Sequence, residues 1–94
     1  MRLSKEEINV LKNELSLLSR RAKLYLFGSR ADDTKKGGDI DILIVCDALN
    51  KKDLRSLRIS FFEKFGEQKL DILLDNGEFK NPFTRLVFQK AILL

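Results

Sequence analysis

The chain has 94 residues, a formal net charge of +4 and an ordinary globular composition, with 44% hydrophobic and 34% charged residues. This length predicts a single domain over residues 1–94, with a limited core and marginal stability. The chain contains no histidine, which excludes Ser-His-Asp and Cys-His nucleophiles, His-ligated zinc and His general bases. Any catalysis must therefore rest on Asp, Glu, Lys, Ser, Tyr or metal ions.

Several features of the sequence predict a cytoplasmic protein without a membrane contact. The first residues lead into a charged segment, and no apolar run approaches the roughly 20 residues that span a bilayer. The single cysteine, Cys46, rules out an internal disulfide, which fits a reducing compartment. The modest positive charge permits a nucleotide or RNA partner without requiring one, and we do not expect direct nucleic-acid binding.

The first third of the chain predicts a helix, a strand and a polar loop. Ser4 and Glu7 form a capping-box pattern, and the apolar residues that follow recur at helical spacing, which predicts a helix over residues 5–19. Residues 23–27 are aromatic and aliphatic, which favours a strand. The polar residues 30–38 predict a loop, or a short helix followed by a loop.

The rest of the chain predicts two more strands and two more helices. Residues 39–45 show the strongest strand alternation, and Asn50 resembles the N-cap of a helix that ends at Gly66. Residues 69–74 predict a third strand, and a short last helix begins after Asn81. The order helix, strand, strand, helix, strand, helix predicts an α/β fold with a small sheet flanked by helices.

Aspartates inside apolar strands are the first candidate site residues. Asp39 and Asp41 lie two apart, so their side chains leave the same face of a strand while isoleucines leave the other. Such close carboxylates repel each other unless a cation lies between them, and Mg²⁺ or Mn²⁺ suits oxygen ligands. Asp71 reaches the same face if its strand is adjacent, whereas Asp75 falls at a turn. The alternative is that these aspartates are solvated.

Gly28 and Ser29 directly follow the first predicted strand and are candidate phosphate ligands. A glycine permits close backbone approach, and backbone N–H groups with a serine hydroxyl bind phosphate well. Arg30, Lys35 and Lys36 are candidate contacts to a triphosphate. The alternatives are a simple turn at the end of the strand and, for the two lysines, a solvated loop.

The combination of these motifs is far more specific than any one of them. The segment LFGSRA at residues 26–31, followed by DIDILI at residues 39–44, resembles the signature of the DNA polymerase β nucleotidyltransferase superfamily. The segment KLDIL at residues 69–73 is similar to the third-aspartate strand of that superfamily. The resemblance covers residues 23–75, and the size of the chain is similar to the minimal nucleotidyltransferases of bacteria and archaea.

The resemblance implies a polymerase β-like fold, in which a small mixed β-sheet is flanked by helices. It implies that three residues hold the triphosphate of ATP or another NTP, namely Gly28, Ser29 and Arg30. It further implies three catalytic acids that bind Mg²⁺, with Mn²⁺ as the alternative, namely Asp39, Asp41 and Asp71. Asp71 would also help to deprotonate the acceptor hydroxyl.

Minimal members of this superfamily are often encoded beside a helical HEPN protein and act as its antitoxin, and some transfer AMP to a tyrosine of that toxin. The resemblance therefore implies a protein adenylyltransferase that partners a HEPN-type toxin, as a homo- or hetero-oligomer. Two alternatives stay open: nucleotidyl transfer to a small molecule such as an aminoglycoside, and a non-catalytic antitoxin or binding module. The apolar residues 91–94 fit either a protein interface or a last helix packed on the chain's own sheet.

Overall fold

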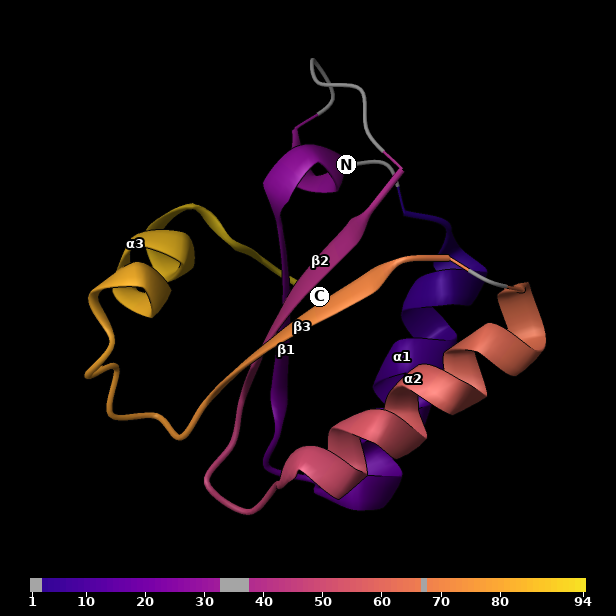
Figure 1. Cartoon of the computed structure of the whole chain (residues 1–94), viewed down its shortest axis with the longest axis horizontal. Helices are drawn as coiled ribbons and strands as arrows, with labels where there is room; N and C mark the ends of the chain where they lie inside the picture. The colour runs from indigo at the N-terminus through magenta and orange to yellow at the C-terminus, as the bar shows by residue number, and fades with distance from the viewer. Residues whose placement is uncertain (1–2, 33–37, 67) are drawn as a thin grey trace.

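The computed structural model describes residues 3–32, 38–66 and 68–94, which build one mixed β-sheet with helices on both faces (Figure 1). The sheet has the strand order β3-β2-β1-β4. Its strands are β1 (Lys23–Phe27), β2 (Ile40–Val45), β3 (Leu70–Asp75) and β4 (Ile92–Leu93). β1 runs antiparallel to β2 and β4, whereas β2 and β3 are parallel. The prediction of an α/β fold with a small mixed sheet is thus confirmed.

Two long helices begin at capping boxes, in which a side chain and a backbone N–H at the helix start bond reciprocally. These helices are α1 (Lys5–Leu18) and α2 (Lys51–Phe65), and their capping pairs are Ser4 with Glu7 and Asn50 with Asp53. The shorter α3 (Pro82–Lys90) begins at Asn81, as predicted from its N-cap and N1 pair. In the described part of the chain, no helix has the length and apolar character needed to cross a bilayer.

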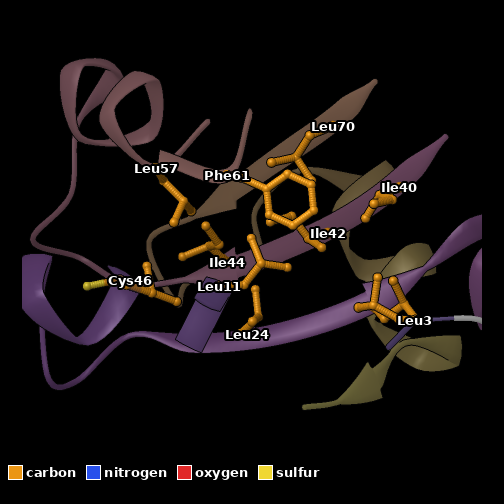
Figure 2. Close-up of a cluster of buried hydrophobic side chains, with 12 residues drawn as sticks. Leu3, Leu11, Leu24, Ile40, Ile42, Ile44, Cys46, Leu57, Phe61 and Leu70 are labelled. Carbon is orange, nitrogen blue, oxygen red and sulfur yellow. The ribbon is translucent and has the colours of Figure 1, made fainter. Parts of the chain in front are cut away.

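The helices cover opposite faces of the sheet. α1 and α2 lie side by side on one face, and α3 lies on the other side of the strands (Figure 1). Figure 2 shows the core between the sheet and the first two helices, where Ile40, Ile42 and Ile44 of β2 meet Leu57 and Phe61 of α2. These five side chains are at most 1% exposed, so this layer supplies much of the hydrophobic stabilisation of the fold.

Aromatic contacts hold α3 on the opposite face. The ring of Phe88 packs edge-on against Tyr25 of β1, with the ring centroids 5.1 Å apart, and lies 4.6 Å from the ring of Phe79. Leu43 points to this side of β2, because it alternates with the isoleucines, and it is fully buried. The face of β2 that carries its aspartate is therefore covered in part by α3.

The last residues of the chain form a strand that the sequence pattern did not predict. Ile92 and Leu93 form β4, which pairs with β1, and the N–H of Leu94 donates to the carbonyl oxygen of Leu24 at 2.9 Å. Of the two alternatives for residues 91–94, the last helix is wrong, because α3 ends at Lys90, whereas the protein interface stays a prediction. Backbone pairing at a sheet edge is compatible with almost any apolar pair, so the local sequence carries little signal for it.

We predict that Phe61→Ala lowers the free energy of unfolding by about 3–5 kcal/mol, because the lost ring leaves a cavity in the core. Urea denaturation monitored by circular dichroism measures this loss. The matched control is Ile59→Ala on the same helix, where the side chain is half exposed and the expected loss is about 1 kcal/mol or less. Equal losses for the two variants would contradict the assignment of Phe61 to the core.

Candidate functional site

The candidate site begins with two aspartates on neighbouring strands. Asp41 of β2 and Asp71 of β3 are direct partners in the parallel register, so their side chains leave the same face of the sheet side by side. The isoleucines that alternate with Asp41 are fully buried on the opposite face, and this burial determines which face the acid occupies. Two of the three acids singled out from the sequence are therefore brought together by strand pairing.

Lys69 links the other acid to this pair. Asp39 lies just before β2, and the N–H of Ile40 donates to the carbonyl oxygen of Lys69 at 2.9 Å, which joins the starts of β2 and β3. Nζ of Lys69 lies 3.5 Å from Oδ2 of Asp39 and 4.0 Å from Oδ2 of Asp71. All three side chains are roughly half exposed or more, so solvent screens these ion pairs and each contributes little stability.

Sequence reasoning did not single out Lys69. A signal for it was available, because Lys69 lies two residues before Asp71, and residues two apart along an extended chain point to the same side.

The surroundings of Asp41 raise the pKa of its carboxyl group above the ordinary value of 3.8. The largest cause is burial, which disfavours the charged form. The charge of Asp71, a hydrogen bond to the Asp71 side chain and the charge of Asp39 raise this pKa further, whereas the charge of Lys69 lowers it. A cation bound between these carboxylates would relieve the same repulsion.

Gly28 opens the short 3₁₀ helix η1 (Gly28–Ala31) directly against Asp41. Its φ angle of +74° lies in the left-handed region, which glycine adopts without a steric penalty. A Cβ at this position would collide with Oδ2 of Asp41 and would lie 3.1 Å from the Asp41 Cγ. Both the backbone conformation and the close approach of the acid therefore require a glycine here. Ser29 follows Gly28 as the second residue of η1.

Arg30 joins η1 to the segment that leads into β2. Its Nη2 donates to the carbonyl oxygen of Gly38 at 3.1 Å, one residue before Asp39. This contact positions backbone close to the acids, while a role for Arg30 in nucleotide binding stays a prediction. Lys35 and Lys36, the two other candidate triphosphate contacts, lie outside the described residues.

Asp75, the weaker candidate acid, lies at the other end of β3 from Asp71. Its carboxylate is buried and accepts hydrogen bonds from the backbone N–H groups of Gly77 at 2.7 Å and Phe79 at 3.2 Å. These bonds stabilise the turn after the strand, so Asp75 has a structural role away from the site.

A cavity of about 500 Å³ adjoins η1. This volume falls within the range of roughly 300–1,000 Å³ that is typical of small-molecule sites. Its described lining residues are Phe27, Gly28, Ser29, Ala31, Asp32 and Lys90. Sequence reasoning did not single out Lys90, because nothing near it in the chain distinguishes it from an ordinary surface lysine.

The three aspartates have the ligand chemistry that a divalent cation requires, but their carboxylates do not converge on one point in this structure. Carboxylate oxygens are the ligands that Mg²⁺ and Mn²⁺ prefer, and the three aspartates lie near the starts of β2 and β3. Among the described residues, however, no three acidic, cysteine or histidine side chains converge as a metal-binding group. Binding through Asp39, Asp41 and Asp71 would require Asp39 and Asp71 to exchange Lys69 for the metal.

The fold and site define a small α/β domain in which two paired acids lie next to a glycine turn and a cavity. The family model described as the nucleotidyltransferase domain matches residues 8–93, and the chain therefore belongs to this family. Membership supports a transferase that moves a nucleotidyl group from an NTP, within the polymerase β-like superfamily. A search of curated proteins found no match to the chain.

We predict that Gly28→Ala destabilises the fold by more than the roughly 1–2 kcal/mol cost of a left-handed alanine, because its Cβ also collides with Asp41. Two glycines provide matched controls for urea unfolding. Gly77→Ala has a positive φ of +99° but open space around its Cβ, and Gly38→Ala has open space without a positive φ. The expected order of losses is Gly28, then Gly77, then Gly38, and equal losses at Gly28 and Gly77 would contradict the close approach to Asp41.

We predict that Asp41→Asn stabilises the metal-free protein at neutral pH. The pKa of Asp41 is higher in the folded chain than in the unfolded chain, so ionisation of this group costs stability at pH values above the folded pKa. The gain should disappear well below pH 3.8, where the aspartate is protonated in both states. Thermal unfolding in chelator across this pH range measures the gain. Asp47→Asn is the control and should show no such gain, because Asp47 is an exposed acid beyond the end of β2 that pairs with Arg21 at 3.2 Å.

Proposed function

We propose that this chain transfers AMP from ATP to a tyrosine hydroxyl of a HEPN-type protein partner and thereby acts as the antitoxin of that partner. The observation that carries the proposal is the Asp41–Asp71 pair beside Gly28, in a chain of the nucleotidyltransferase domain family. The choice of acceptor rests on the resemblance to minimal nucleotidyltransferases. The same proposal treats residues 1–94 as one minimal nucleotidyltransferase domain in the cytoplasm.

In this proposal η1 binds the triphosphate. Gly28 carries no side chain of its own, which lets the backbone of η1 lie directly against the Asp41 carboxylate and leaves its N–H groups accessible to a phosphate. The Ser29 hydroxyl and the guanidinium of Arg30 donate hydrogen bonds to phosphate oxygens. These contacts orient the α-phosphorus of ATP towards the acids across the short distance that separates Gly28 from Asp41.

The three aspartates provide the chemistry of transfer. The acceptor oxygen forms a bond to the α-phosphorus, the bond between that phosphorus and the bridging oxygen of pyrophosphate breaks, and pyrophosphate leaves. Asp71 accepts the proton of the acceptor hydroxyl. Asp39, Asp41 and Asp71 would hold divalent metal, Mg²⁺ or Mn²⁺, which supplies charge stabilisation for the attacking and leaving oxygens.

Exposed apolar side chains support a protein partner. Phe83 and Leu86 lie three residues apart on one side of α3, and each is more than half exposed. Leu93 of the edge strand β4 is also more than half exposed. Large apolar side chains gathered on an outer helix favour a protein interface over full solvation. A non-catalytic antitoxin would use the same surface, so the experiment must separate binding from transfer.

The test is mass spectrometry of the purified protein with its co-purifying partner after incubation with ATP and Mg²⁺. We expect the partner to gain one or more AMP units and a chelator to prevent the gain. Asp39→Ala/Asp41→Ala should reduce the rate at least about a hundredfold, because loss of metal ligands removes several kcal/mol of transition-state stabilisation. Asp47→Ala, which removes an exposed acid of the same strand region, should retain the wild-type rate.

Three outcomes would change the proposal. Stable partner binding without modification, in wild type and double variant alike, would identify a non-catalytic antitoxin. Modification of an aminoglycoside, with an unmodified protein partner, would identify a small-molecule transferase. Undiminished transfer by the double variant would contradict the roles of Asp39 and Asp41.

A further inference from the structure

One wall of the cavity beside η1 comes from a distant part of the chain rather than from residues 27–32. Among its described lining residues, Lys90 alone comes from outside the segment 27–32. Lys90 is the last residue of α3, about sixty positions further along the chain. The tertiary structure therefore brings a cationic side chain to the same hollow that Gly28 and Ser29 line.

Aromatic contacts near the end of α3 set the position of Lys90. Phe88, two residues earlier, contacts the rings of Tyr25 and Phe79, which anchors the end of α3 on β1. Tyr25 and Phe27 alternate along β1 and face the same side of the sheet, where Phe27 is the register partner of Asp41. The end of α3 thus lies over the sheet face that carries the acids.

Two charged side chains, Asp32 and Lys90, line the described part of the cavity. The carboxylate of Asp32 repels a phosphate. Lys90 supplies a positive charge on the wall of the same cavity. Within the described ranges it forms no ion pair with an acidic side chain. Among the described lining residues Lys90 is the one cationic side chain, and a positive charge on the cavity wall favours a polyphosphate.

We propose that Lys90 is a further nucleotide-binding residue. It contacts the polyphosphate of the NTP from the α3 side of the cavity, while η1 contacts the polyphosphate from the opposite side. This inference rests on the proposed function, because it assumes that an NTP occupies the cavity beside Gly28 and Ser29. It makes α3 part of the nucleotide site, in addition to its packing role on the sheet.

The test compares ATP binding by wild type, Lys90→Ala and Arg85→Ala, measured by isothermal titration calorimetry in the presence of Mg²⁺. Arg85 is an exposed residue of the same helix that does not line the cavity, so its loss changes the net charge equally. We expect Lys90→Ala to weaken ATP binding about tenfold or more, Arg85→Ala to change it little, and Lys90→Arg to retain most of the affinity. Binding of adenosine, which carries no phosphate, should not respond to Lys90→Ala.

The outcomes separate this inference from the proposed function. If wild type binds ATP and Lys90→Ala binds it equally well, the inference about Lys90 is wrong and the proposed function stands. If Lys90→Ala and Arg85→Ala weaken binding equally, the effect is long-range charge and the inference is also wrong. If wild type binds none of the four NTPs, both fail. Thermal unfolding of Lys90→Ala measures separately the small contribution of this lysine to the C-terminal end of α3.

Discussion

The parallel pairing of β2 with β3 is the constraint on which the rest of the site depends. Asp41 and Asp71 are adjacent because they are register partners, and a shift of β2 by one residue would turn Asp41 toward the core. The isoleucines of β2 prevent that shift, because all three are fully buried beneath α1 and α2. The hydrophobic effect on one face of the strand thus holds two like charges together on the other face.

The proximity of the acids lowers the stability of the fold at neutral pH. The pKa of Asp41 is raised because burial and neighbouring carboxylates disfavour its charge, so the acid pair weakens the fold at neutral pH. Lys69 offsets part of the repulsion by contacting Asp39 and Asp71. Since its side chain is largely exposed, solvent screens these contacts and they contribute little stability. The fully buried isoleucines of β2 supply hydrophobic stabilisation that opposes this cost.

The two faces of the sheet differ in what they carry. The face under α1 and α2 contains most of the buried apolar side chains, whereas the face under α3 carries the acids, the glycine turn and the adjoining cavity. α3 is held by aromatic contacts to β1, so its last turn reaches the cavity while Phe83 and Leu86 remain exposed on its outer side. In our proposals, nucleotide contacts and the partner surface lie on different sides of this one short helix.

Local patterns in the sequence determined the elements and most of the candidate residues. Capping boxes at Ser4 and Asn50 and the Ile/Asp alternation of β2 are short-range signals, and the helices and strands they predict are present. The tertiary structure alone decided what depends on distant residues: the β2 neighbour of Asp71, β4 as an edge strand, the contact of Lys69 with Asp39, and the approach of Lys90 to the cavity. These features arise from strand order and helix packing, and such contacts leave no periodic trace in the chain.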